Sequence, residues 1–190
     1  MNCLKTILVA IAFALTGCAA TVQKSAPATS SAPSATTSAA AQAPVRVPEE
    51  ASKRLVLNMT GSKVSTEAKD WVAFKQEWRA IFQQQAIAAG LKFDFQEGDA
   101  RPNGESGTLL AVVVNDYRYV GIGARLAFGI MTGNAYLDAT LRFRNLRDGA
   151  TFGEQAYNTS SSAWHGVFAA MTPKQIYAIA DEVIREMKTR

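Results

Sequence analysis

Residues 135–144 read Ala-Tyr-Leu-Asp-Ala-Thr-Leu-Arg-Phe-Arg, and their alternation is the strongest fold signal in the chain. The odd positions carry alanine, leucine or phenylalanine, whereas the even positions carry tyrosine, aspartate, threonine or arginine. Successive side chains of a strand point to opposite faces of a sheet, so this pattern predicts a strand with one covered and one open face.

More strands are predicted on both sides of this one. Asp148-Gly149 is typical of a hairpin turn, so residues 151–159 are expected to return as the partner strand. Upstream, residues 54–59 and 91–95 have the composition of short strands. Residues 108–114 are apolar on both faces, which favours a central place in the sheet.

Two helices are predicted to cover that sheet. The first is expected to be capped at Ser65 or Thr66 and to end at Gly90 in a left-handed conformation. The second begins with Thr172 as cap, Pro173 and Gln175, a combination typical of a helix start. Their apolar stripes are spaced three and four residues apart: Trp71, Phe74, Trp78, Ile81 and Phe82 in the first helix, and Ile176, Ile179, Ala180, Val183, Ile184 and Met187 in the second.

The predicted fold class is therefore α+β. We expect a small antiparallel or mixed sheet with two helices packed on one face, in the order β-α-β-β-β-β-α. No internal repeat of fixed period is visible in the sequence.

The N-terminus has the layout of a secretory signal: Lys5, then an apolar run, then small residues. Leu15-Thr16-Gly17-Cys18 resembles the lipobox of bacterial lipoproteins in all four positions. That resemblance implies that residues 1–17 are removed and that Cys18 carries lipid chains, which would hold the protein on a membrane. Cys18 is followed by alanine and not by aspartate, which favours the outer membrane, with the domain facing the periplasm.

A tether is predicted to follow the anchor. From residue 19 to 45, 22 of 27 residues are Ala, Ser, Thr or Pro, a composition that lacks the large apolar groups needed for a core. We expect residues 18–53 to be the lipidated cysteine and a disordered tether, spanning roughly 30 to 35 Å as a flexible coil. Residues 54–190 are then the single folded domain.

Composition excludes several classes of function. The net charge of +4 is too weak to indicate a nucleic-acid partner. The two cysteines, Cys3 and Cys18, both lie near the N-terminus, and His165 is the one histidine. We therefore expect neither a disulfide, nor a metal site, nor a bound cofactor in the domain.

Residues 119–135 contain a glycine-rich run with Arg125, followed by Gly133-Asn134-Ala135. With the long strand, the Asp-Gly turn and the closing helix, this run resembles the Gram-negative lipoprotein family called domain of unknown function 4410, over roughly residues 54–187. The resemblance implies a lipoprotein domain without established catalytic residues.

Candidate sites are few. Arg142 and Arg144 project from one face of their strand with Tyr136 and Thr140, so this face is either a solvated surface or a binding surface for an envelope protein or an anionic glycan. Gly121 and Gly123 lack the third glycine of a dinucleotide motif and predict a turn or loop. Two hydrolytic sites are also candidates, and both lack the motifs of known hydrolases. One is a serine-histidine triad through His165 with Asp116 or Asp181. The other is a pair of carboxylates among Asp94, Glu97, Asp99 and Glu105.

The sequence thus favours an outer-membrane lipoprotein whose domain is a non-enzymatic binding or assembly module of the cell envelope. Two alternatives remain open. One is an envelope hydrolase acting on peptidoglycan or glycan. The other is an accessory lipoprotein of lipopolysaccharide or secretion transport, because the element order resembles that of the lipopolysaccharide-assembly lipoprotein.

The anchor gives the first testable prediction. Because the lipobox places the thiol of Cys18 at the cut site, Cys18→Ser should abolish incorporation of radiolabelled palmitate and release the protein from membranes or leave it unprocessed. Unchanged labelling of the variant would contradict the lipoprotein assignment.

Overall fold

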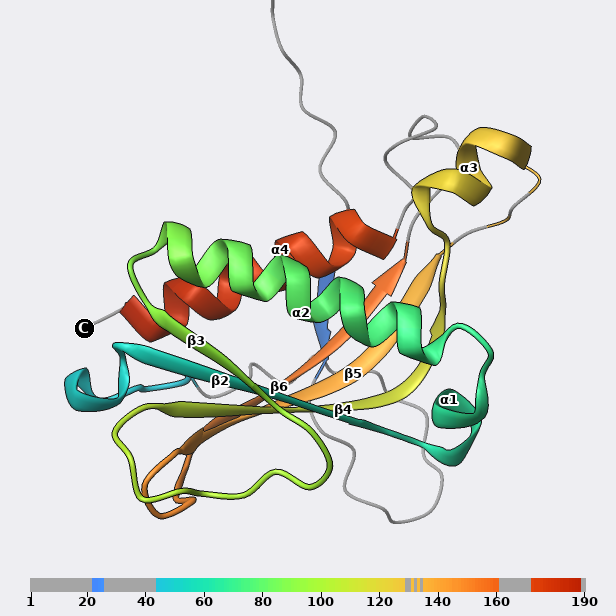
Figure 1. Ribbon diagram of the computed structural model, residues 1–190. Helices are drawn as coiled ribbons and strands as arrows, with labels where there is room; N and C mark the ends of the chain where they lie inside the picture. The colour runs from blue at the N-terminus through green and yellow to red at the C-terminus, as the bar shows by residue number, and fades with distance from the viewer. Residues whose placement is uncertain are drawn as a thin grey trace, which may run out of the picture.

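The backbone of the domain is a mixed sheet under two long helices (Figure 1). The computed structural model describes residues 22–25, 44–128, 131, 133, 135–160 and 172–188. The strands are β1 (Val22–Ser25), β2 (Arg54–Gly61), β3 (Lys92–Gln96), β4 (Thr108–Arg118), β5 (Tyr136–Asn145) and β6 (Thr151–Ser160). The helices are α1 (Lys63–Glu67), α2 (Trp71–Ala88), α3 (Ile122–Phe128) and α4 (Thr172–Lys188), with one 3-10 turn at Glu49–Ala51.

The sheet order is β1-β6-β5-β4-β2-β3. Strand β2 runs parallel to both β3 and β4, and the other neighbours are antiparallel. The α+β class and the mixed sheet are thus confirmed. The predicted list of elements is incomplete, because β1, α1, α3 and the 3-10 turn were not expected.

The core lies between the helices and one face of the sheet. In β5, Leu137, Ala139, Leu141 and Phe143 are all fully buried, as the alternation predicts. Helices α2 and α4 pack against each other and contribute their apolar stripes to this same core. Aromatic rings of α2 reach the central strand, where Phe74 stacks on Tyr117 with ring centroids 4.2 Å apart.

The first predicted helix begins later than the sequence indicated. Ser62 caps the short α1, and its side chain accepts a hydrogen bond from the Ser65 backbone N–H. Ala68 is extended, so the helix breaks there and α2 starts at Trp71. The predicted end is confirmed, because Gly90 follows α2 with a φ of +78°.

The predicted boundary at residue 54 is wrong. Val45, Val47 and Ala51, which were assigned to the tether, are buried in the core. Val45 packs on β6 at Gly153, where a Cβ atom would stand 2.9 Å from the Val45 Cγ2 atom. The folded domain therefore begins by residue 44. The two core residues Val45 and Val47 were missed because they lie between prolines at the end of the Ala/Ser/Thr/Pro-rich stretch.

The prediction of a tether disordered throughout is also wrong for residues 22–25. They form β1, which pairs antiparallel with β6 from Val22↔Thr159 to Ser25↔Ala156. This is where Val-Gln-Lys interrupts the Ala/Ser/Thr/Pro run. An unpaired β6 would expose a row of backbone donors and acceptors, and β1 satisfies part of that edge.

Trp78 should be the largest single contributor to the core, because it is fully buried and stacks on Phe82 with ring centroids 5.3 Å apart. We expect Trp78→Ala to lower the free energy of unfolding by about 3 to 5 kcal/mol, as large-to-small core substitutions do. Val72→Ala, on the exposed side of the same helix, should cost less than about 0.5 kcal/mol. Urea melts of the unlipidated chain from residue 19 measure both, and equal losses would contradict the assigned core.

Candidate functional site

The face of the sheet opposite the helices carries the polar residues of β5. Cross-strand register places Arg142 between Ala111 of β4 and Glu154 of β6, and Arg144 beside Leu109 of β4. Residues 97–107, which connect β3 to β4, contribute Asp99 and Ala100 to this side. The open face therefore combines the polar side chains of β5 with a small apolar cluster of Val56, Leu109 and Leu146, and a loop bounds it.

A hollow of about 350 Å³ lies on this face. Strands β2, β4, β5 and β6 and the loop before β4 provide its walls. The lining residues are Asn58, Thr60, Asp99, Ala100, Ala111, Val113, Arg142, Arg144 and Thr151. Two of the three side chains predicted as a binding surface, Arg142 and Arg144, thus lie together at one hollow.

The two arginines have different partners. The Arg142 Nε donates to Glu154 Oε2, and 52% of the Arg142 side chain stays exposed. The Arg144 Nε donates to the Gly149 carbonyl at 3.1 Å, which fastens the turn between β5 and β6. The Arg142 guanidinium is therefore half-exposed and paired with Glu154, whereas Arg144 has a structural role in the turn.

Asn58 is a site residue that the sequence analysis missed. Its side chain is 1% exposed, and its Nδ2 donates to the carbonyls of Gln96 at 3.0 Å and Gly98 at 2.8 Å. Its Oδ1 has no hydrogen-bond partner among the described residues. A buried polar atom without a partner is costly, and among the described residues Trp78 Nε1, Thr159 Oγ1 and Gln175 Oε1 share this state, so the amide oxygen is an unsatisfied buried group beneath the hollow. The only sequence signal was a polar residue inside the apolar strand β2.

Tyr136 does not belong to the hollow. Six residues separate it from Arg142 along β5, which is roughly 20 Å in a strand. Its hydroxyl donates to Asp116 Oδ2 at 2.8 Å. That hydrogen bond, followed by burial, raises the pKa of Tyr136 above its ordinary value. The structure therefore separates Tyr136 from the two arginines.

The loop carboxylates considered for hydrolysis are each engaged by a cation. Arg54 contacts both Asp94 and Glu105. Lys75 contacts Glu97 at 2.7 Å, and Arg101 contacts Asp99 at 3.3 Å. These ion pairs favour a structural role, since they tie the loop between β3 and β4 to α2 and β2.

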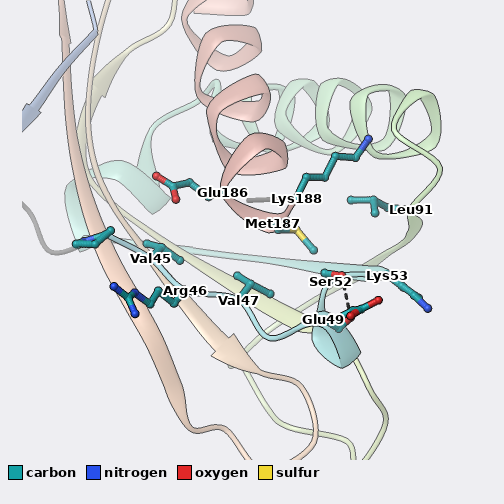
Figure 2. A pocket seen from close by; sticks show the side chains of 11 residues that line it. Val45, Arg46, Val47, Glu49, Ser52, Lys53, Leu91, Glu186, Met187 and Lys188 are labelled. Carbon is teal, nitrogen blue, oxygen red and sulfur yellow. Dashed lines mark hydrogen bonds between the residues drawn. The ribbon is translucent and has the colours of Figure 1, made fainter. Parts of the chain in front are cut away.

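A second, larger hollow of about 980 Å³ lies at the C-terminal end of α4 (Figure 2). Its apolar wall is formed by Val45, Val47, Leu91 and Met187, and Figure 2 shows Leu91 and Met187 directed into it. Charged residues, including Arg46, Lys53 and Lys188, complete the lining. Such a wall suits an apolar group with a charged neighbour. None of the candidate site residues from the sequence analysis lines this hollow.

The other sequence candidates contribute little to either hollow. Cys18, His165 and Asn134 lie outside the described residues, and so does the side chain of Arg125. Gly121 directly precedes α3 and Gly123 is its second residue, so the predicted loop contains a short helix. Gly133 has a φ of +74°, a left-handed conformation that favours glycine, and the flexible Arg118 guanidinium lies within 3 Å of where a Cβ would stand.

Within the described ranges, no group of three or more histidine, cysteine, aspartate or glutamate side chains is arranged to hold a metal ion. In the same part of the chain, none of the helices has the length and apolar character needed to cross a membrane.

Comparisons with known proteins give a likeness to solved structures alone. No protein-family model matches the chain, and no curated protein matches it. The chain is similar to the PelC dodecamer from Paraburkholderia phytofirmans, with 14% identity, a TM-score of 0.46 and coverage of 90% of this chain and 98% of that chain. A point variant of the same dodecamer gives 14% identity, a TM-score of 0.45 and the same coverage. A likeness of this strength assigns no activity, ligand or partner to the chain.

The pairing of Arg142 with Glu154 changes what a charge reversal should do. Arg142→Glu places a second carboxylate opposite Glu154, and like charges directly opposite across a strand pair are destabilising, by roughly 0.2 to 1 kcal/mol. Arg142→Gln should cost less, and Arg142→Glu combined with Glu154→Arg should recover most of the loss. Urea melts of the three variants measure the coupling, and equal stability of all three would show that the pair has no energetic role.

Proposed function

We propose that the chain is an outer-membrane lipoprotein, anchored through Cys18, whose domain faces the periplasm and acts as a non-enzymatic binding module of the cell envelope. The ligand class that fits the open face best is an anionic glycan. The resemblance to the domain of unknown function 4410 agrees with a lipoprotein role and stays a prediction.

The observation that carries this proposal is the hollow on the open face, where the half-exposed Arg142 guanidinium and the buried Asn58 line one concave surface. A guanidinium binds carboxylate or sulfate oxygens. An acidic sugar presents such a group on one small ring. The volume of about 350 Å³ is at the small end of ligand pockets, which favours a sugar unit over a folded protein segment.

The two alternatives receive less support. A glycoside hydrolase needs one carboxyl group to act as acid beside a second carboxylate, and the loop carboxylates here are held in ion pairs with Arg54, Lys75 and Arg101. No described contact singles out a transport partner. A binding module that works by contact therefore remains the better proposal.

The binding test uses Arg142→Gln, which removes the cation without creating the repulsion described above. A charge-assisted hydrogen bond contributes roughly 1.5 to 3 kcal/mol, so capture of polygalacturonate should weaken about tenfold or more. Neutral dextran should not be captured by either protein, and Arg147→Gln, on the exposed turn, is the matched control. Equal binding by wild type and Arg142→Gln would contradict the proposal.

His165→Ala decides between binding and hydrolysis. We expect it to leave polygalacturonate capture unchanged. If the wild type instead releases sugars from peptidoglycan or polygalacturonate and His165→Ala abolishes that turnover, the hydrolase takes the place of the binding module.

A further inference from the structure

Four large apolar side chains are exposed together on α3 and just after it. Ile122 is 51% exposed, Leu126 63%, Phe128 66% and Met131 89%. We call these four residues the apolar tip. Figure 1 shows α3 standing beyond the ends of β5 and β6, clear of the core under α2 and α4. Grouped apolar side chains of this kind on a soluble domain mark an interaction surface.

The base of the tip is held firmly by α4. The Val120 backbone N–H donates to Thr172 Oγ1 at 2.9 Å, and the Thr172 N–H donates back to the Val120 carbonyl at 3.3 Å. On the other side of the tip, Gln175 Nε2 donates to the Ala135 carbonyl at 3.3 Å. Val120 and Ala135 are both buried. Two buried polar side chains of α4, Thr172 and Gln175, therefore hold both ends of a segment whose apolar residues are exposed.

The described residue nearest in sequence to the proposed anchor, Val22, lies at this same end of the sheet. Register places Val22 opposite Thr159, and Thr159 opposite Leu137, which is two residues after the base of the tip at Ala135. Cys18 precedes Val22 by four residues, which span at most about 14 Å even when fully extended. The pairing of β1 thus keeps the anchor point close to the sheet, in place of the long spacer that composition predicted.

We propose that the apolar tip inserts into the leaflet that holds the Cys18 lipid, so that the domain rests on the bilayer by its α3 end. This inference rests on the proposed lipid anchor and adds a second, non-covalent membrane contact. Apolar side chains presented at an interface bury themselves about 5 to 10 Å into the headgroup and acyl boundary. Residues 119–135 contain Arg125 as their only charged residue and no acidic residue, so an anionic leaflet would not repel them.

A second copy of the chain fits the tip less well. A stable protein interface buries roughly 800 Å² on each partner, which four partly packed side chains cannot supply alone. A bilayer needs no such area or shape match, because the lipid anchor already provides attachment and the tip only has to add to it.

The experiment uses the mature lipidated chain reconstituted in vesicles of three parts phosphatidylethanolamine to one part phosphatidylglycerol. Met131→Cys introduces a thiol for an environment-sensitive nitrobenzoxadiazole label. Ile87→Cys is the matched control, because Ile87 is also a well-exposed apolar residue but lies at the opposite end of α2 from the α3 end. We expect a blue shift of emission and strong quenching by doxyl lipids at position 131, and neither at position 87.

The absence of a shift at position 131, or an equal shift at both positions, overturns the inference. So does a shift at position 131 that persists in lipid-free detergent solution and rises with protein concentration, which would identify a second copy as the occupant. Phe128→Ser and Leu126→Ser together should reduce the lipid quenching at position 131 severalfold, whereas Val72→Ser should not.

Failure of the anchor is seen separately. The parent chain should take up no label, because Cys3 is removed and the Cys18 thiol is acylated. Labelling of the parent overturns the proposed lipoprotein function and this inference with it. An unlabelled parent combined with no shift at position 131 overturns only the inserted tip.

Discussion

The aromatic side chains of α2 pack on the central strands of the sheet, and this contact determines which face of the sheet is buried and which is exposed. Phe74 stacks on Tyr117 of β4, and Trp78 stacks on Phe82 of the same helix within the core. Because these rings cover one face, every inward-pointing side chain of β5 from Leu137 to Phe143 is fully buried. The opposite face carries the polar side chains of β5 beside a small apolar cluster of Val56, Leu109 and Leu146. A one-sided core of this kind produces both a stable layer and an open surface on the same strands.

The buried polar groups of the domain differ in whether their hydrogen bonds are satisfied. Tyr117 donates its hydroxyl to Asp70 at 2.7 Å, and burial together with this partner raises its pKa well above the ordinary value, so it stays neutral and protonated. Burial likewise raises the pKa of Tyr157. Asn58 differs from both, because its oxygen lacks a described donor while it lines the open-face hollow. The first two are satisfied structural groups, and the third leaves a hydrogen bond to be completed.

Much of the fold could be predicted because its signals are local. The period of two in residues 135–144, the spacing of Trp71, Phe74 and Trp78, and the glycine at position 90 each specify their own structure. The missed features depend on partners distant in sequence. Val45 is a core residue because Gly153 leaves room for it, and β1 forms only against the edge of β6. The same difference applies to the candidate site. Arg142 and Arg144 could be predicted because they share one face of one strand, whereas Asn58 reaches them only through the pairing of β2 and β5 with β4.

The two proposed surfaces are compatible with each other because they lie at different heights along β5. This strand starts at Tyr136, next to the α3 end, and reaches Arg142 after six residues, which is roughly 20 Å. With β5 along the membrane normal and the apolar tip in the leaflet, the Arg142 hollow would lie roughly 10 to 15 Å beyond the 5 to 10 Å depth at which interfacial side chains are buried. A ligand in the hollow would meet the guanidinium in the aqueous periplasm and not among lipid phosphates. In these two proposals, the length of β5 separates the surface that would contact the membrane from the surface that would bind the glycan, and both belong to one sheet.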